Sequence, residues 1–434
     1  MASVVPSARW TLSCFLVFVL AAHAVKAFSE TFNDNLAVYW GQDSAGHQQR
    51  LGFYCDDDTI DTIPLAFLYI FFGKGGQPVI DFANICSSGS GNFPGTDLAD
   101  CSFLASDIQK CQAKGKLITL SLGGATAKVG FDSASQASSF AATIWNMFLG
   151  GNGGIRPFGD AVLDGVDLDI ENGSSAHYDT FVNTLRSLSK NAPKKFGRYY
   201  VTAAPQCPFP DAKVGEALNN AFFDAVYVQF YNNFCETSAP SEFNFATWDH
   251  WAKTQSMNKD VKVYLGAPGS ADSAGNGFVS SQALINVARQ AQQQYSSFGG
   301  IMLWDADTAY TNNKYHATVK NAIKNRQPGP QPSTIETLPP APSPTHTQST
   351  TPRPPQPTQS SSSSQVKPPA PESSDPPTPS PISSPSPLPD PRWTARVRRP
   401  KFTLDFRNIP AASPTPVFGQ PTPRRHSRHF QASL

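Results

Sequence analysis

The sequence predicts a closed α/β barrel of eight parallel strands, followed by a tail too polar to form a core. Two observations lead to this fold class. Residues 28–326 are apolar, aromatic and punctuated by glycine, and roughly 300 residues is a usual length for one such barrel. Within this part, short β-rich runs alternate with segments long enough for helices, as expected of repeated parallel βα units.

Residues 1–27 are predicted to be a secretory signal peptide. Arg9 precedes an apolar run over residues 10–22, and the small residues Val25 and Ala27 frame a cleavage site. The run is too short to span a bilayer. We therefore expect export into an oxidising compartment, with the mature chain beginning at residue 28.

The eight predicted strands are short runs rich in β-branched, aliphatic and aromatic residues. They are expected at 36–40, 65–72, 117–122, 165–171, 199–204, 225–231, 261–265 and 301–304. Predicted helices between them include 100–114, 134–148, 175–190, 211–222 and 281–295. Barrels of this kind carry their sites at the C-terminal ends of the strands. Those ends are polar, glycine-rich or aromatic here, as in the turn 121–124 and at Trp304.

The fourth strand is unusual because acidic and aliphatic residues alternate along it from residue 163 to 171. As a strand, it places Asp167, Asp169 and Glu171 on one face and aliphatic side chains on the other. An exposed edge strand with a solvated acidic face would give a similar pattern, but the uniformly aliphatic second face favours a buried strand. Three crowded carboxylates cannot all ionise, so a proton is shared and Glu171, at the open end, is a candidate general acid.

The run Asp164-Gly165-Val166-Asp167-Leu168-Asp169-Ile170-Glu171 resembles the DGxDxDxE signature of glycoside hydrolase family 18, the chitinases. The turn Ser121-Leu122-Gly123-Gly124 is similar to the family's SxGG motif on the third strand. The resemblance covers about 36–324 and fits the compact class III type of plants and fungi. It implies substrate-assisted retaining hydrolysis, in which the acetamido oxygen of the sugar attacks its own C1.

By this resemblance, Glu171 is the general acid/base, Asp169 orients the acetamido N–H, and Asp167 shares a proton with Asp169. Tyr231 matches the tyrosine that hydrogen-bonds the acetamido carbonyl, and Trp304 matches the tryptophan beneath the sugar, although a core aromatic would also fit there. The remaining candidate binding residues lie at the C-terminal ends of predicted strands. Gln229 and Asn232 stand beside Tyr231, Tyr39 is on the first strand, and Gly124 follows the third. For Tyr39, a place in the cleft wall and a packing role remain equal alternatives.

Cysteine usage favours disulfides over a metal site. Cys14 lies in the signal, which leaves six cysteines without a CxxC or HExxH spacing. Fifteen pairings are open from spacing alone. The resemblance implies Cys55 with Cys111 and Cys86 with Cys101, while Cys207 and Cys235 follow adjacent strands and are expected to pair. No metal and no cofactor are expected.

The predicted function is a secreted endochitinase that hydrolyses β-1,4 linkages between N-acetylglucosamine units. The formal net charge of +1 offers no field for nucleic acid or a membrane surface, so we expect a neutral polysaccharide as partner and a monomeric enzyme. One alternative is an endo-N-acetylglucosaminidase or muramidase of the same family. Another is a catalytically silent chitinase-like lectin or inhibitor, although such proteins typically lack the terminal acid that Glu171 supplies.

The tail is predicted in two pieces. Residues 327–391 are a Pro/Ser/Thr-rich linker that cannot bury enough surface to fold and is a candidate for O-glycosylation. Residues 392–434 are basic, which would suit anionic wall polymers or a solvated disordered end. The C-terminus lacks the hydrophobic stretch of a GPI signal, so we expect release to the medium or loose wall association.

Overall fold

The computed structural model describes residues 28–89, 91–192 and 197–324. Its strands form one sheet that closes on itself, because β1 pairs with both β9 and β2. All neighbouring pairs around the barrel are parallel. The eight barrel strands are β1 (Asn35–Val38), β2 (Thr62–Ile70), β4 (Leu117–Gly123), β5 (Gly165–Asp169), β6 (Tyr200–Ala203), β7 (Ala225–Gln229), β8 (Lys262–Pro268) and β9 (Phe298–Trp304). The fold prediction, an eight-stranded α/β barrel, is confirmed.

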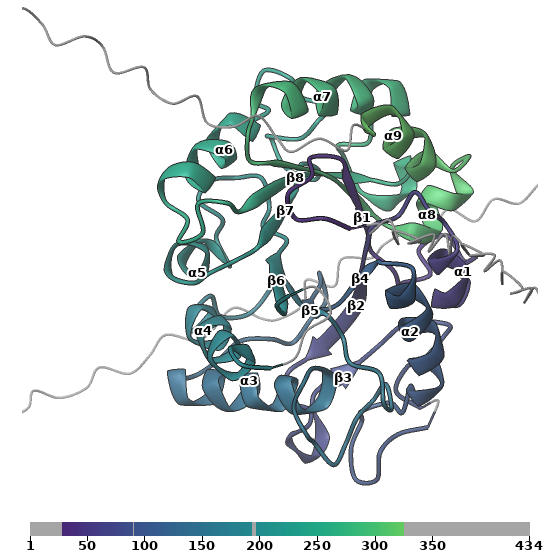
Figure 1. The fold of residues 1–434 in the computed structure, drawn as a ribbon, viewed down its shortest axis with the longest axis vertical. Coiled ribbons are helices and arrows are strands. Elements are labelled where there is room, and N and C mark those ends of the chain that lie inside the picture. Colours follow the sequence, from purple (N-terminus) through teal and green to yellow (C-terminus); the bar gives the residue numbers. More distant parts are fainter. Residues whose placement is uncertain (1–27, 90, 193–196, 325–434) are drawn as a thin grey trace, which may run out of the picture. The chain divides into compact units, whose positions relative to one another are not determined.

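Helices surround the barrel on its outside (Figure 1). They are α1 (Leu51–Cys55), α2 (Ala105–Ala113), α3 (Ala134–Phe148), α4 (Tyr178–Ser189), α5 (Gly215–Asn220), α6 (Phe245–Thr254), α7 (Ser281–Gln294), α8 (Ala306–Thr311) and α9 (Tyr315–Ile323). Three short 3-10 helices lie at Lys74–Gly76, Ser102–Leu104 and Ala271–Ser273. The predicted helices 134–148 and 281–295 match α3 and α7 closely because serine N-caps fix their starts: Ser133 accepts from Gln136 N–H, and Ser280 from Ala283 N–H.

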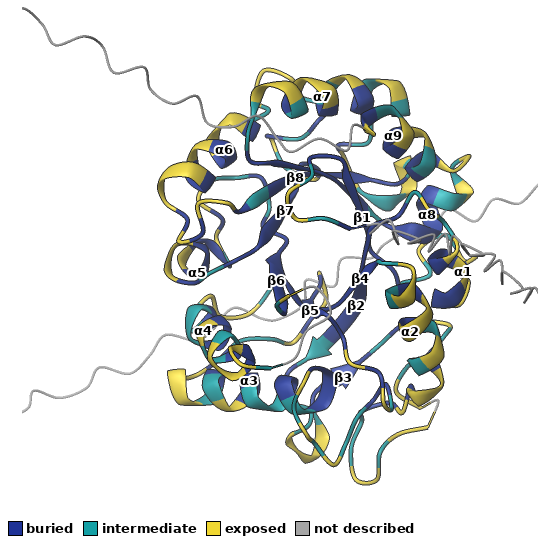
Figure 2. Ribbon diagram, viewed as in Figure 1, coloured by how far each residue is buried: buried dark blue, intermediate teal, exposed yellow. Residues whose placement is uncertain are grey.

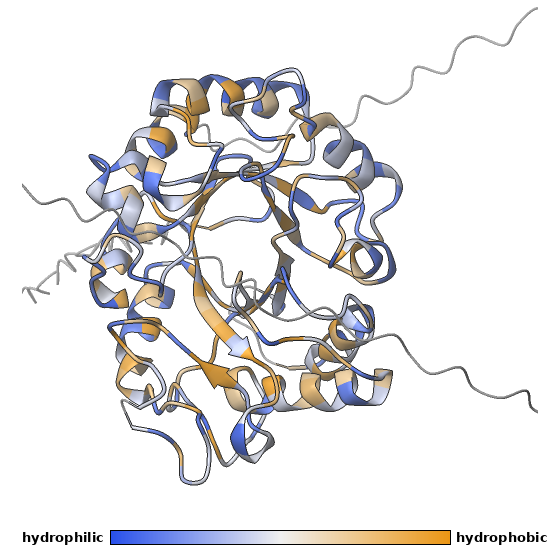
Figure 3. Ribbon diagram, turned by 180° about the vertical axis from the view of Figure 1, so that it is seen from behind, coloured by the Kyte–Doolittle hydropathy of each residue, from blue (hydrophilic) through white to orange (hydrophobic). Residues whose placement is uncertain are grey.

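Burial divides the barrel into an outer and an inner core. Between strands and helices, the side chains are mainly aliphatic, and the helices turn their polar faces outward (Figures 2 and 3). Inside the barrel, the buried set is aromatic and small, and includes Tyr39, Phe67, Tyr227 and Tyr264. The parallel strands are therefore buried on both faces, as expected when helices cover the sheet. The inner tyrosines bring hydroxyl groups close to the acidic strand.

The structure moves several predicted boundaries. β2 begins at Thr62 rather than residue 65, and β5 ends at Asp169, so Glu171 lies just beyond its strand. A short strand, β3 (Val79–Ile80), pairs antiparallel with β2 outside the barrel order and was not predicted. The predicted signal peptide, linker and basic tail lie outside the described residues. No helix in the described ranges is both long and apolar enough to cross a membrane.

Three disulfides tie loops to the barrel. Cys55 at the end of α1 joins Cys111 in α2, and Cys207 after β6 joins Cys235 after β7. The third pair is Cys86–Cys101. These are the pairs that the sequence analysis gave. Cys207–Cys235 fixes two adjacent loops at the C-terminal rim, which is the end of the barrel that carries the pocket described next.

Candidate active site

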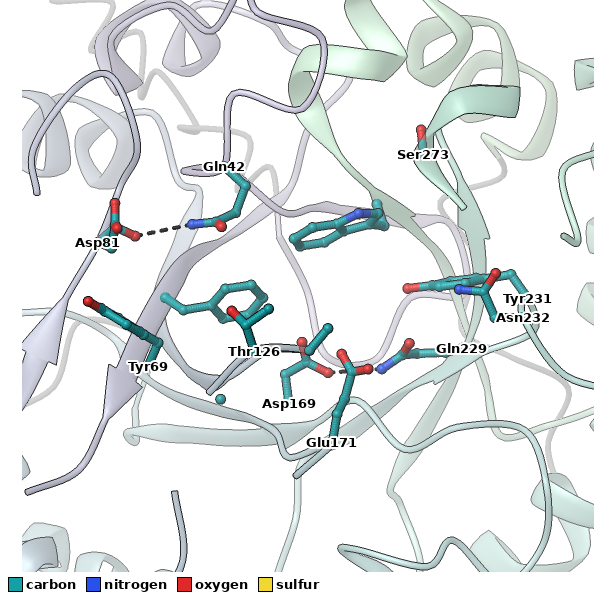
Figure 4. Close-up of a pocket in the computed structure, with 15 residues that line it drawn as sticks. Gln42, Tyr69, Asp81, Thr126, Asp169, Glu171, Gln229, Tyr231, Asn232 and Ser273 are labelled. Carbon is teal, nitrogen blue, oxygen red and sulfur yellow. Dashed lines mark hydrogen bonds between the residues drawn. The ribbon is translucent and has the colours of Figure 1, made fainter. Parts of the chain in front are cut away.

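A pocket of about 330 Å³ opens at the C-terminal ends of the strands. Its lining combines carboxylates, amides, glycines and aromatic rings: Gln42, Phe67, Tyr69, Asp81, Gly123, Gly124, Ala125, Thr126, Asp169, Glu171, Gln229, Tyr231, Asn232, Ser273 and Trp304. Asp169, Glu171 and Gln229 converge in its middle, Tyr231 and Asn232 lie on one side, and Gln42, Tyr69 and Asp81 lie on the other (Figure 4). The volume falls in the usual range of a small-molecule site.

Asp167 lies beneath the pocket and is completely buried. Its carboxylate accepts three hydroxyl hydrogen bonds, each at 2.7 Å, from Tyr39, Ser121 and Thr202. Burial raises the pKa of Asp167, and these three donors act against the rise. The donors come from β4, β6 and the end of β1, so the barrel itself fixes this first acid.

Asp169 is the next acid along β5 and lines the pocket. Its Oδ1 accepts a 2.9 Å hydrogen bond from Gln229 Nε2 on β7. The pKa of Asp169 is raised well above its ordinary value, first by burial and then by the negative charges of Glu171, Asp167 and Asp211. Proton sharing within this group of acids therefore follows from their environment.

The glycines of the β4 turn let strands β4 and β5 approach each other here. Gly123 has a φ of +122°, and a Cβ at this position would overlap the carbonyl oxygen of Asp169. Gly124 N–H donates to that same carbonyl oxygen at 2.8 Å. A side chain at Gly123 would displace Asp169, and a Cβ at Gly124 would lie 2.9 Å from the ring of Phe67, so both glycines are required by the geometry of the site.

Glu171 is partly buried at the pocket opening. Its pKa is raised by burial and then by the charge of Asp211, in the loop between β6 and α5. Asp211 is itself held by three backbone N–H groups, those of Gln206, Lys213 and Val214, at 2.7–2.9 Å. The sequence predicted a raised pKa for Glu171 from crowding of the acids along the strand. In the structure the causes at Glu171 are burial and the loop that carries Asp211, while the neighbouring acids of the strand raise the pKa of Asp169.

The β7 end supplies the other polar groups. Tyr231 is buried, faces the pocket, and has a pKa raised by burial and by the charges of Asp169 and Glu171. It therefore remains a neutral hydroxyl that can donate or accept a hydrogen bond. Gln229 is held by Asp169 and donates also to the carbonyl oxygen of Ala204. Asn232 adopts a φ of +58°, and its Oδ1 accepts from Gly275 N–H and Asn276 N–H.

Comparison with known proteins agrees with this geometry. The model of the glycosyl hydrolases family 18 matches residues 35–282. The chain belongs to this family. It is 46% identical over 307 residues to Chitinase 2 of Rhizopus oligosporus, covering 70% of this chain and 55% of that protein. It is 38% identical over 333 residues to the class III chitinase of Arthroderma benhamiae, covering 73% of this chain and 94% of that protein.

A solved structure shows that the family 18 fold also occurs in a protein named for inhibition. The xylanase and alpha-amylase inhibitor protein from Scadoxus multiflorus aligns with a TM-score of 0.56 and 32% identity, covering 66% of this chain and 98% of that one. This chain spans between about half and three fifths of the length of the first curated relatives that it matches. Family membership is thus shown, whereas the activity has to be argued from the site.

Trp304 and Tyr39 have different places in this family 18 barrel. Trp304 lines the pocket at the end of β9, and its ring stacks on Phe67 with centroids 5.6 Å apart. Tyr39 is only 2% exposed and lies outside the pocket lining, with its hydroxyl donated to Asp167. Of the two alternatives left open for Tyr39, its position favours the packing role, and its place among the substrate-binding candidates is corrected. The Tyr39 side chain belongs to the inner core of the barrel, so its ring lies below the pocket and its hydroxyl supports Asp167.

Several pocket residues were not predicted from the sequence. Asp211 lies outside the lining and follows a proline in a loop. Of the lining residues, Phe67 and Tyr69 lie on β2, Ser273 ends a 3-10 helix, and Gln42, Asp81 and Thr126 lie in loops. For Gln42, the position just after predicted strand 36–40 was an available signal, whereas Phe67 lies inside predicted strand 65–72 and Ser273 lies well beyond predicted strand 261–265. Asp81 lies just after β3, a strand whose two residues give no periodicity to detect. Across the described ranges, no three His, Cys, Asp or Glu side chains form a candidate metal site.

Proposed function

We propose that this family 18 chain is a secreted endochitinase that cleaves β-1,4 linkages between N-acetylglucosamine units with retention of configuration. One observation carries the proposal. A partly buried carboxyl with a raised pKa, Glu171, stands beside a second acid, Asp169, and a neutral tyrosine, Tyr231, above an aromatic floor. This arrangement offers a proton, an acceptor for an amide N–H and a hydrogen-bond donor within one sugar-sized site.

The reaction would begin with proton transfer from Glu171 to the glycosidic oxygen as the bond to C1 breaks. The acetamido oxygen of the same sugar would attack C1 and form an oxazolinium ion. Asp169 would accept a hydrogen bond from the acetamido N–H and balance the positive charge, while Tyr231 would donate to the acetamido oxygen. Glu171, now a carboxylate, would then take a proton from water as that water attacks C1, so the configuration is retained.

Asp167 would support this sequence from below. Three hydroxyl donors hold the carboxylate of Asp167 in place. Proton sharing between Asp167 and Asp169 would let the Asp169 side chain turn from Asp167 toward Glu171. Trp304 and the stacked Phe67 would pack against the C–H face of the reacting ring. Gln229 would keep Asp169 oriented, and Asn232 would border the pocket mouth. Gly124 would keep its corner of the pocket clear.

A covalent mechanism would need a second carboxylate as nucleophile. Asp81 is the remaining carboxylate among the described residues that line the pocket. It lies on the side of the pocket away from Tyr231 (Figure 4), and its Oδ1 accepts from Ala83 N–H. We therefore assign the nucleophile to the substrate. Extracellular localisation is part of the proposal and is supported by three disulfides.

The test compares a six-unit N-acetylglucosamine oligomer with its fully deacetylated counterpart. The protein is expected to cleave the first at internal linkages and to leave the second intact. NMR of the first products should show the β-anomer. The Asp81→Asn variant should keep both the turnover and the β-anomer. Equal cleavage of the deacetylated oligomer, or loss of turnover in Asp81→Asn, would contradict substrate assistance.

Two other functions give different results in the same series. Cleavage of a high-mannose glycopeptide in preference to the oligomer would identify an endo-N-acetylglucosaminidase. The inhibitor named above motivates a second arm. No cleavage of any glycan, together with inhibition of a xylanase or an α-amylase, would identify a non-catalytic member of the family and overturn the proposal.

A further inference from the structure

A second pocket, also of about 330 Å³, opens in the loop that follows β7. It is lined by Asn232, Asn233, Phe234, Glu236, Ala239 and Asn276. Asn232 belongs to both pockets, so the second one adjoins the candidate active site at that residue. A chain-like ligand that leaves the first pocket over Asn232 would enter the second.

Phe234 is the main apolar feature of this pocket. Its ring is 64% exposed, the largest exposed fraction among the large apolar side chains of the described residues. Exposure of a phenyl ring to water is unfavourable, by about 25 cal/mol per Å² of apolar surface. An isolated exposed ring needs no explanation, but one that lines a pocket beside a polysaccharide site is a candidate binding surface.

The loop that carries Phe234 is held on both sides of the ring. Asn233 Nδ2 donates to Gln206 Oε1 at 3.0 Å, and the next residue, Cys235, is bound to Cys207. Two residues further on, Thr237 Oγ1 donates to the carbonyl oxygen of Gly277 at 2.7 Å. The ring is therefore presented by a fixed backbone, which lowers the entropy lost when a ligand binds.

The charges and polar groups of the pocket define the chemistry of its ligand. The six lining residues include three asparagines and one carboxylate, and no lysine or arginine. Amide and carboxylate groups can exchange hydrogen bonds with hydroxyl and acetamido groups, whereas an anionic ligand would meet Glu236 without a balancing cation. An aromatic face beside such groups matches a pyranose ring, which has an apolar C–H face and a polar edge.

We propose that this second pocket, the Phe234 subsite, binds one sugar unit of a long N-acetylglucosamine chain at a distance from the bond that is cut. The proposal rests on the polysaccharide activity proposed above. Phe234 would stack against the pyranose ring, and the side chains of Asn276 and Glu236 would hydrogen-bond its edge. The subsite would then contribute to long substrates, while substrates that fill only the first pocket would not reach it.

Kinetics on two chain lengths test this subsite. In Phe234→Ala, the ratio of kcat/KM for a six-unit oligomer to that for a two-unit chromogenic substrate is expected to fall about two- to tenfold. Phe234→Tyr should retain the ratio because its ring can still stack. Met257→Ala is the matched control, because Met257 is 57% exposed outside both pockets, and should leave the ratio unchanged. An unchanged ratio in Phe234→Ala would overturn the subsite.

A binding measurement separates this proposal from the activity. Calorimetric titration of Glu171→Gln with the six-unit oligomer is compared with that of Glu171→Gln/Phe234→Ala. Weaker binding in the double variant, by a similar two- to tenfold, supports the subsite even if the wild-type protein cleaves nothing. Equal affinity in the two variants overturns the subsite and leaves the proposed function untouched. Thermal unfolding of Phe234→Ala should match the wild type, since the ring is exposed.

Discussion

Both ends of the barrel bury carboxylates, but in the described part of the chain Asp61 and Asp224 at the N-terminal end pair with cations, whereas the acids of β5 do not. At the N-terminal end, Asp61 lies 2.6 Å from Lys320, and Asp224 lies 2.7 Å from both Arg186 and Arg198. At the C-terminal end, no lysine, arginine or histidine in the described part of the chain forms an ion pair with the acids of β5. We interpret the paired acids at the N-terminal end as structural and the unpaired acids of β5 as catalytic.

The N-terminal acids share one structural device. Asp61, Asp164 and Asp224 each stand directly before a strand, and each accepts a backbone N–H from the neighbouring strand at 2.7–2.8 Å. The donors are Leu36, Ile118 and Val201, respectively. This bond fixes the register of adjacent strands. The first acid of the β5 signature, Asp164, thus has a structural place, while Glu171 at the other end of the same stretch faces the pocket.

The two ends of the barrel should differ in whether a substitution lowers activity or stability. The largest effect, a loss of activity, is expected from Glu171→Gln at the C-terminal end. Glutamine keeps the shape of the side chain but cannot donate an acidic proton, so turnover should fall by roughly 10²–10⁴-fold. Thermal stability should be maintained, because the change puts a neutral group of the same shape in place of a partly buried carboxyl that forms no ion pair among the described residues. The measurement is hydrolysis of the six-unit oligomer together with a thermal unfolding curve. Glu242→Gln, the same change at an exposed site, is the control, and near-normal turnover in Glu171→Gln would refute its assignment as the acid.

The converse result is expected at the N-terminal end from Lys320→Met. Lys320 and Asp61 are both almost fully buried, so the substitution leaves Asp61 without its partner. The free energy of unfolding should fall by about 3–5 kcal/mol. Activity per folded molecule should be unaffected, because Lys320 lies outside the pocket lining. Urea unfolding at pH 7 measures the loss.

The pH dependence of Lys320→Met gives a second check on the same pair. Burial already raises the pKa of Asp61, against the charge of Lys320, and loss of that charge raises it further. The native variant then binds a proton more readily than the unfolded chain, so the loss in its free energy of unfolding relative to wild type should shrink as pH falls.

Two further variants serve as controls for this pair. Asp61→Asn/Lys320→Met should recover much of the stability. Lys114→Met, which breaks an exposed pair with Asp56, should cost at most about 1 kcal/mol.

The same contrast shows which features the sequence could reveal. The period-two alternation of β5 identified the acids and their strand, because each acid is separated by one residue and the pattern lies within nine positions. The predicted helices 134–148 and 281–295 likewise match α3 and α7, whose starts the structure shows to be capped by serines. The ion pair of Asp61 with Lys320 joins residues 259 positions apart, so no local pattern could predict it.

The sequence could not decide a role that depends on the direction of a side chain rather than on its position in the chain. Tyr39 and Tyr231 both stand at strand ends and have the same side chain, yet one points down to Asp167 and the other lines the pocket. Asp211 shows a further limit. Its effect on Glu171 depends on a loop conformation set by three backbone hydrogen bonds, which the sequence alone does not specify.

The smallest effect at the C-terminal end is expected from Asp211→Asn. The carboxylate of Asp211 raises the pKa of Glu171, and asparagine removes that charge while its amide oxygen can still accept from Val214 N–H. The pKa of Glu171 should fall, so the protonated form that acts as acid is lost at a lower pH. The alkaline limb of the kcat/KM profile should therefore move toward lower pH, with the acid limb less affected. Asp160→Asn, an exposed acid remote from the pocket lining, should leave the profile in place. An alkaline limb that stayed in place in Asp211→Asn would mean that burial alone raises the pKa of Glu171. Asp211 would then have no part in tuning the acid at the C-terminal end of the barrel.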